Sequence, residues 1–131
     1  MTRFLLDTHV FLWLQATPER VRPELLEELA DDGSDLLLSA ASSWEIAIKA
    51  GLGKLTLPEP PDRYVPAAAR RSGVEPIPVG HPEALAVAAL PPHHRDPFDR
   101  LIIAQARLLD ARVITADDAF TRYEVTTVDP R

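Results

Sequence analysis

The fold is decided by the stretch His94-Arg95-Asp96-Pro97-Phe98-Asp99-Arg100-Leu101-Ile102-Ile103-Ala104-Gln105-Ala106. Asp96 is a favoured N-cap residue, and Pro97 suits the first helical position, where its missing N–H costs nothing. Asp99 falls at the third helical position, where a carboxylate can bond back to the cap and meets the positive end of the helix dipole. The apolar residues that follow predict a largely buried helix.

Two interpretations of this stretch are open. In the first, Asp96 and Asp99 only cap a core helix. In the second, the two carboxylates lie one turn apart, are held rigidly and face a shared site. The choice depends on what the rest of the chain brings to the same place.

Strands and helices are expected to alternate on both sides of this helix. Short apolar runs predict strands at residues 3–6, 36–38, 74–79, 112–115 and 125–128, and the third is short or at a sheet edge because it holds two prolines. Helical patterns lie between them, at 8–15, 23–29, 42–49, 62–72 and 82–90. The alternation predicts an α/β three-layer sandwich, with a mainly parallel central sheet of about four or five short strands and helices on both faces.

Length and composition narrow the class of protein. The 131 residues suit a single domain, 1–131, and the absence of cysteine excludes disulfides and favours the cytoplasm. No apolar run approaches membrane-spanning length, so no membrane partner is expected, and Met1-Thr2-Arg3 leads into a strand rather than a signal peptide. The net charge of −6, taken alone, argues against a nucleic-acid partner, because phosphate binding normally needs a basic surface.

Four acids are expected at one edge of the predicted sheet. Asp7 ends the first strand and Glu45 lies in the helix after the second; Asp99 opens the central helix and Asp117 follows the fourth strand. Ligands bind beyond the carboxyl ends of parallel strands. Carboxylates gathered there repel one another and need a compensating cation, and oxygen ligands without cysteine suit Mg²⁺ or Mn²⁺. Such ions commonly drive phosphodiester hydrolysis.

Each acid also has a purely structural explanation. Asp7 can be a turn residue, and Asp117 can cap a short helix toward Phe120. Glu45 can be an exposed partner of Lys49, one helical turn away. The convergence of all four acids on one edge favours the site over these separate explanations.

Three further side chains are candidates to support the site. Ser39 and Thr115 end strands beside the acids, so their hydroxyls can hold a metal-bound water or cap a turn. His94 is close to Asp96 and can support a metal ligand without binding the metal itself. None of the four histidines has the spacing of a metal-binding motif.

The sequence resembles the PIN domain, and most of all the VapC-type toxins of bacterial type II toxin–antitoxin systems. The resemblance rests on segments in the right order along nearly the whole chain: Leu5-Leu6-Asp7-Thr8-His9, Ser43-Trp44-Glu45-Ile46-Ala47-Ile48-Lys49 with Gly53-Lys54-Leu55, Asp96 to Ala106, and Ile114-Thr115-Ala116-Asp117 with Phe120. No single motif is highly specific, but the set is.

The resemblance implies a Mg²⁺- or Mn²⁺-dependent ribonuclease, usually a homodimer, that is silenced by a small antitoxin encoded beside it. The acidic positions of the family match Asp7, Glu45, Asp99 and Asp117, which we therefore expect to be catalytic. Asp7, Asp99 and Asp117 are the expected metal ligands, with Glu45 and Asp96 as further candidates. Asp96 belongs to a variant pattern within the family.

An acidic chain is compatible with an RNA substrate. The four site acids contribute −4 of the −6, so the rest of the chain carries −2. Bound divalent ions would neutralise the pocket, and Lys49, Arg95 and Arg100 are candidates to hold RNA phosphates. A negative pocket also suits an antitoxin that supplies a basic residue to it.

The alternative function is an acidic-pocket signalling or binding module of α/β fold without nuclease activity. A receiver-like domain needs an Asp at the end of the central strand and a Lys after the last one; here the 74–79 strand ends without an acid, and no such Lys is found. A two-aspartate phosphatase needs a second Asp two residues after Asp7, but that position is His9. A metal-free binding protein that kept the fold stays open.

Overall fold

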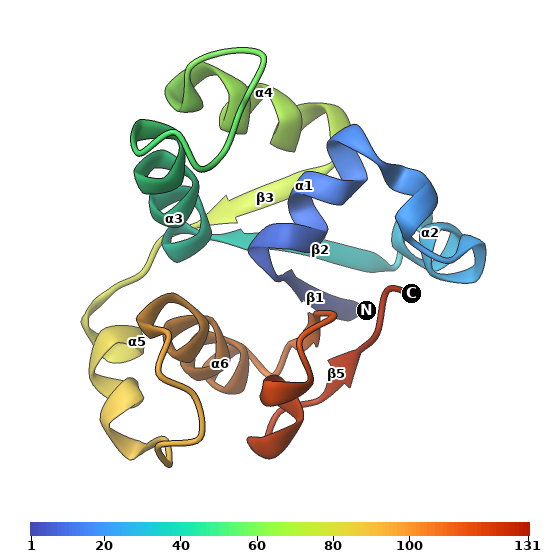
Figure 1. The fold of residues 1–131 in the computed structure, drawn as a ribbon. Coiled ribbons are helices and arrows are strands. Elements are labelled where there is room, and N and C mark those ends of the chain that lie inside the picture. The colour runs from blue at the N-terminus through green and yellow to red at the C-terminus, as the bar shows by residue number, and fades with distance from the viewer.

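The computed structural model describes residues 1–131 and contains one five-stranded sheet. The strands are β1 (Thr2–Leu6), β2 (Ser34–Ser39), β3 (Val74–Ile77), β4 (Arg112–Ile114) and β5 (Thr127–Val128). Their order is β3-β2-β1-β4-β5, and every neighbouring pair is parallel. Helices cover both faces of the sheet, which confirms the predicted three-layer α/β fold (Figure 1). The proline-containing β3 is an edge strand, as its sequence predicted.

Six α-helices and three short 3₁₀ helices connect the strands. The α-helices are α1 (Thr8–Ala16), α2 (Pro23–Ala30), α3 (Ala40–Gly51), α4 (Pro61–Ser72), α5 (His81–Ala86) and α6 (Pro97–Leu109). The 3₁₀ helices are Pro18–Arg20, Val87–Ala89 and Asp118–Arg122. The helix expected at 82–90 is therefore divided into α5 and a 3₁₀ turn. No helix has both the length and the apolar character needed to cross a bilayer.

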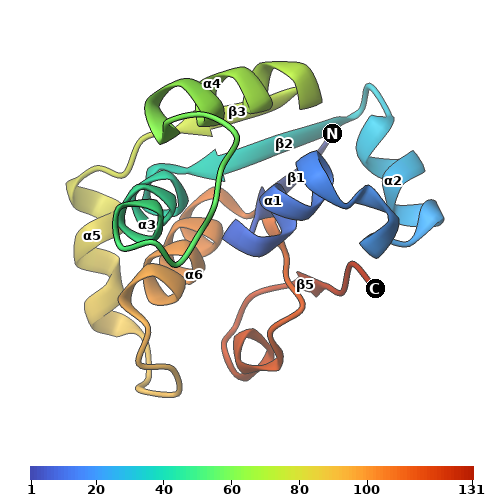
Figure 2. The same cartoon turned by 45° about the horizontal axis from the view of Figure 1, so that its top comes forward.

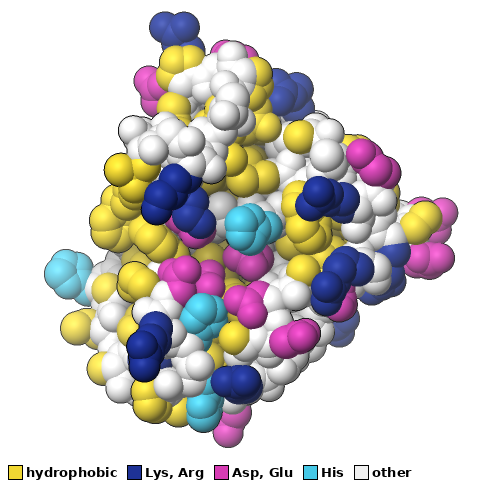
Figure 3. Space-filling view, viewed as in Figure 1, with side chains coloured by type: hydrophobic (Ala, Val, Ile, Leu, Met, Phe, Trp, Pro, Cys, Tyr) yellow, Lys and Arg dark blue, Asp and Glu magenta, His cyan; other side chains and the backbone are white.

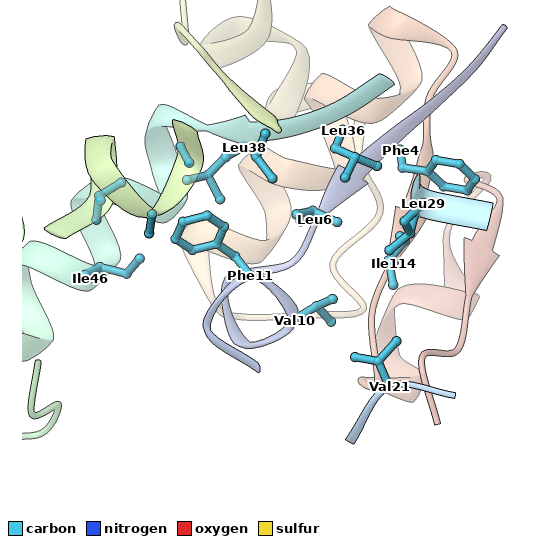
Figure 4. Close-up of a cluster of buried hydrophobic side chains, with 14 of the residues drawn as sticks. Phe4, Leu6, Val10, Phe11, Val21, Leu29, Leu36, Leu38, Ile46 and Ile114 are labelled. Atoms are coloured by element: carbon cyan, nitrogen blue, oxygen red, sulfur yellow. The ribbon is translucent and has the colours of Figure 1, made fainter. Parts of the chain in front are cut away.

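Successive side chains of β1 enter two different hydrophobic cores. Phe4 and Leu6 pack on one face of the sheet with side chains of α1, α2 and α4, as Figure 4 shows in part. Leu5 packs on the other face with Ile102 and Ile103 of α6. This division follows from the period of two along a strand. Each fully buried side chain of this size contributes about 1.5–3 kcal/mol, so packing on both faces holds the strands firmly in place.

The path of the chain creates a crevice between β1 and β4. From β1 the chain adds β2 and then β3 on one side, with α1, α2 and α4 on the same face. It then passes through α5 and α6 on the opposite face to reach β4, on the other side of β1 (Figure 2). Ligands of open α/β sheets bind where the strand order reverses in this way. Asp7 directly follows β1, and Thr115 directly follows β4.

The N-terminus of α6 is built largely as its sequence predicted. Asp96 is the N-cap, and its Oδ1 accepts hydrogen bonds from the backbone N–H groups of Phe98 at 2.9 Å and Asp99 at 3.4 Å. Pro97 is the first helical residue. The expected bond from the Asp99 carboxylate back to the cap is not formed, because the backbone N–H of Asp96 donates to Nδ1 of His94 at 3.2 Å. The carboxylate of Asp99 does not cap α6 and instead lines a pocket.

Candidate active site

A pocket of about 400 Å³ opens at the crevice between β1 and β4. All five acids singled out in the sequence line it. In the space-filling view, acidic and histidine side chains gather near the middle of one face, with lysine and arginine side chains around them (Figure 3). The lining residues are Asp7, His9, Trp13, Glu45, Lys49, His94, Asp96, Asp99, Ala116 and Asp117.

Asp7 is held by hydrogen bonds at both of its carboxylate oxygens. Its Oδ1 accepts a hydrogen bond from the backbone N–H of Thr8 at 2.8 Å, which caps α1. Its Oδ2 accepts from the Thr115 hydroxyl at 2.8 Å, and the same hydroxyl oxygen accepts from the backbone N–H of Asp117 at 3.0 Å. Thr115 thus joins the acids that follow β1 and β4. Burial raises the pKa of Asp7 despite these hydrogen bonds.

Asp99 carries the largest electrostatic penalty of the site. Its Oδ2 lies 2.8 Å from Nε2 of His94, and the same nitrogen lies 3.2 Å from Oδ2 of Asp117. Burial raises the pKa of Asp99 to about 8, and the negative charges of the neighbouring carboxylates, Asp7 foremost, add to the effect. Without a cation, the neutral form of this carboxyl is therefore favoured at neutral pH.

Glu45 reaches the pocket from α3 and has one oxygen without a partner. Its Oε2 accepts a hydrogen bond from Nζ of Lys49 at 2.7 Å, and this bond raises the pKa of the lysine. The two residues do pair at one helical turn, but Glu45 is buried rather than exposed. Its Oε1 is buried without any hydrogen-bond partner. A buried polar atom in this state is uncommon and indicates a partner that the chain does not supply.

The residues present fit a hard divalent cation. The pocket offers carboxylate oxygens from several chain segments, which are the ligands that Mg²⁺ and Mn²⁺ prefer. One potential ligand atom from each of His94, Asp99 and Asp117 lies within 4.8 Å of the others. A cation there would offset the repulsion that raises the pKa of Asp99 and could engage the unpartnered oxygen of Glu45. The catalytic and metal-binding roles of individual acids stay predictions.

Ser39 and Arg100 serve structural purposes. The hydroxyl oxygen of Ser39 caps α3 by accepting from the backbone N–H of Ala41 at 3.1 Å, and its contact with a metal-bound water stays a prediction. The guanidinium of Arg100 donates to the carbonyl oxygens of Pro91 at 2.9 Å and Val87 at 3.2 Å. Both terminal nitrogens of Arg100 are thus engaged within the chain, and its contact with RNA phosphates stays a prediction. A local sequence pattern does not reveal such acceptors on a neighbouring loop.

Two residues of the pocket were missed by the sequence analysis as site residues. His9 and Trp13 line the pocket from α1, and Arg20 lies over the Trp13 ring at 5.3 Å from its centroid. The available signal was their spacing: they are four residues apart and thus share one face of the helix that Asp7 caps.

Residues 4–125 match the model of the PIN domain, so the chain belongs to the PIN domain family. A segment of 51 residues is 55% identical to Ribonuclease VapC16 from Mycobacterium tuberculosis (strain ATCC 25618 / H37Rv). That match covers 39% of this chain and 36% of the relative, so the chain spans little more than a third of the length of the curated relative it matches.

Solved structures of similar fold share little sequence with the chain. The crystal structure of VapBC2 from Rickettsia felis, bound to a DNA fragment from its promoter, aligns with a TM-score of 0.75 at 17% identity, over 97% of this chain and 98% of that one. The DNA-bound VapBC from Salmonella typhimurium aligns with a TM-score of 0.68 at 17% identity, over 100% of both chains. At these identities the likeness establishes the fold alone.

The raised pKa of Asp99 predicts that the metal-free protein loses stability as the pH rises. The folded state keeps the proton up to about pH 8, whereas the unfolded chain releases it near pH 4. The stabilisation is therefore complete below about pH 4 and is lost as the pH rises toward 8. Asp99→Asn, which mimics the neutral acid, should be more stable than the parent by at least about 1 kcal/mol above pH 8 in EDTA.

Denaturant unfolding at about pH 4, about pH 6 and about pH 8.5 measures this difference in stability, because these values span the unfolded and folded pKa values of Asp99. Asp32→Asn is the matched control, because Asp32 lies exposed in the turn before β2 and its loss changes the net charge equally. A variant at position 99 that is no more stable than the parent at alkaline pH would contradict the assigned electrostatic penalty.

Proposed function

We propose that the chain is a metal-dependent ribonuclease of the VapC type that hydrolyses RNA phosphodiester bonds. The proposal rests on one observation: four acids line one pocket, Asp7, Glu45, Asp99 and Asp117. This pocket lies where the strand order reverses, in a chain of the PIN domain family. The relative named a ribonuclease matches one segment of the chain at 55% identity and adds support.

The acids have separate roles in this proposal. Asp7, Asp99 and Asp117 hold the metal ion, with Glu45 and Asp96 as additional candidates. When bound, Mg²⁺ or Mn²⁺ supplies a Lewis acid for the phosphate and lowers the pKa of a water molecule. Glu45 lines the same pocket, and its Oε1 has no hydrogen-bond partner within the chain. Thr115 orients Asp7 through its hydroxyl.

RNA would approach along the basic rim of the pocket. Lys49 lines both the acidic pocket and a neighbouring depression of about 300 Å³, which Lys54 and Leu55 also line. Lys49 and Lys54 are the only lysines of the chain. Arg95 is exposed beside His94 and is a further candidate for a phosphate contact. Lys49 therefore pairs with Glu45 inside the acidic pocket, whereas Lys54 and Arg95 lie outside its lining.

The chain is further proposed to be the cytoplasmic toxin of a toxin–antitoxin pair and to form a homodimer. The helix α3 presents Trp44 and Ile48 one turn apart, its C-cap residue Leu52 continues the line, and all three are exposed. An exposed apolar stripe of this kind supports contact with another protein chain. The negative pocket in turn suits an Arg or Lys supplied by an antitoxin.

Cleavage of RNA should require a divalent ion. The purified protein should cut RNA oligonucleotides in millimolar Mg²⁺ or Mn²⁺ and stop in excess EDTA, and Asp99→Asn should lose activity by orders of magnitude, because it removes a metal-binding charge. Asp96→Asn should keep the fold, since Asn caps a helix about as well as Asp. Undiminished cleavage in EDTA, with contaminating nuclease excluded, would contradict the proposal. Metal binding without RNA cleavage would favour the alternative, an acidic-pocket binding module.

The lysine rim predicts a salt-dependent RNA affinity. In an Asp99→Asn background, which leaves RNA uncut, Lys54→Gln should reduce the slope of log Kd against log salt by about 0.7, the value for one phosphate contact to a single strand. Fluorescence anisotropy at several salt concentrations gives the slope. Arg112→Gln is the control, because Arg112 begins β4 and lies at the opposite end of the sheet strands from the pocket. Equal slopes for the two variants would show that Lys54 makes no contact with an RNA phosphate.

Binding of the antitoxin should compete with binding of the divalent metal ion. An antitoxin encoded next to this chain should co-purify with it and abolish cleavage, and Mn²⁺ binding should weaken in the complex because a basic residue occupies the acidic pocket. Calorimetric titration of the complex with Mn²⁺, beside the free toxin, measures the competition. Full Mn²⁺ affinity in an inhibited complex would refute this mode of inhibition, though not the pairing.

A further inference from the structure

His94 is held in place at both its backbone and its ring. Its backbone N–H donates to the hydroxyl of Tyr123 at 2.7 Å, and that tyrosine is buried. Its ring packs edge-on against Phe120, with 6.2 Å between the ring centroids. Its Nδ1 accepts a hydrogen bond from the backbone N–H of Asp96 at 3.2 Å. The side chain thus has little freedom to turn away from the pocket.

The loop that carries His94 is fastened to α6 by Arg100. Besides Pro91 and Val87, the Arg100 guanidinium reaches the carbonyl oxygens of Leu90 at 3.3 Å and His94 at 3.5 Å. It also donates to the Tyr123 hydroxyl at 3.3 Å. The same helix therefore presents Asp99 and holds the loop that places His94 against it.

The hydrogen bond at Nδ1 fixes the tautomer of the ring. A backbone N–H can donate only to a nitrogen with a free lone pair, so Nδ1 of His94 is unprotonated and the proton of the neutral ring lies on Nε2. This Nε2 faces two acceptors, Oδ2 of Asp99 at 2.8 Å and Oδ2 of Asp117 at 3.2 Å. A protonated nitrogen has no lone pair for a metal ion. His94 is therefore arranged as a donor to the carboxylates rather than as a metal ligand.

We propose that His94 is a positioning residue whose Nε2–H holds Asp99 and Asp117 at the separation from which they bind the metal ion. The inference rests on the proposed function for the presence of that ion. In their ionised forms, the carboxylates of Asp99 and Asp117 repel each other across α6 and the segment after β4, and a donor shared between them opposes their separation. Side chains that orient metal ligands in this way typically account for 10–100-fold in metal affinity.

The test is metal affinity in the absence of RNA. His94→Ala should weaken Mn²⁺ binding by about 10–100-fold in calorimetric titration. His94→Gln should retain most of the affinity, because its amide N–H can donate toward the same carboxylates. His93→Ala is the matched control: the neighbouring His93 packs against the Tyr123 ring, with 5.3 Å between centroids, and does not line the pocket. Thermal melts of all variants in EDTA separate lost positioning from lost folding.

A second measurement distinguishes a donor from a ligand. Nitrogen-15 NMR of the histidine rings should show Nε2 of His94 protonated both without metal and with saturating Mg²⁺. Loss of that proton on Mg²⁺ loading would overturn the inference, because His94 would then be a ligand. Unchanged Mn²⁺ affinity in a folded His94→Ala protein would also overturn it, while leaving a parent that binds metal and cuts RNA intact. A parent that binds no Mn²⁺ at all would overturn the proposed function as well.

Discussion

The crowding of carboxylates at the ends of β1 and β4 is the constraint on which the other features depend. Burial and mutual repulsion raise the pKa of both Asp7 and Asp99, so the fold has to hold these groups where their ionised forms are disfavoured. The two hydrophobic cores, one on each face of the sheet, supply the rigidity for this. A pocket with a surplus of negative charge is the result, and it suits a divalent cation.

The chain opposes the repulsion by giving the acids hydrogen-bond donors. Asp7 receives the Thr8 N–H and the Thr115 hydroxyl, and Glu45 receives the Lys49 ammonium. Asp99 and Asp117 share Nε2 of a single histidine. Because Oε1 of Glu45 receives none, the network is incomplete on one side. The protein thus orders the acids but supplies an ammonium only to Glu45, which is a state suited to binding a cation from solution.

Helix capping and site building coincide in this fold. Asp7, Asp96 and Asp117 cap α1, α6 and the 3₁₀ helix Asp118–Arg122, respectively, and all three line the pocket. Helices that follow parallel strands begin at the carboxyl edge of the sheet, where ligands bind. A carboxylate at such a position meets exposed backbone N–H groups and the positive end of the helix dipole. Asp96 therefore caps α6 and lines the pocket at the same time, so its role as a cap does not argue against a shared site.

The sequence by itself determined the elements and the edge at which the acids lie. Apolar periodicity, the Asp96-Pro97 cap and the turns between strands are local signals. They were enough to predict the layered parallel sheet and to place four acids at one edge, Asp7, Glu45, Asp99 and Asp117. Only the tertiary structure decided that the Arg100 guanidinium donates hydrogen bonds to carbonyl oxygens of the segment before α6. It likewise decided the burial of Glu45 with one oxygen unpartnered.

The contacts of His94 were also decided by tertiary structure, since Tyr123, which holds its backbone, is 29 residues away in the chain. The physical reason is that periodicity fixes which face of an element a side chain occupies. Which donor reaches which acceptor depends on how distant segments pack, and no local pattern specifies that.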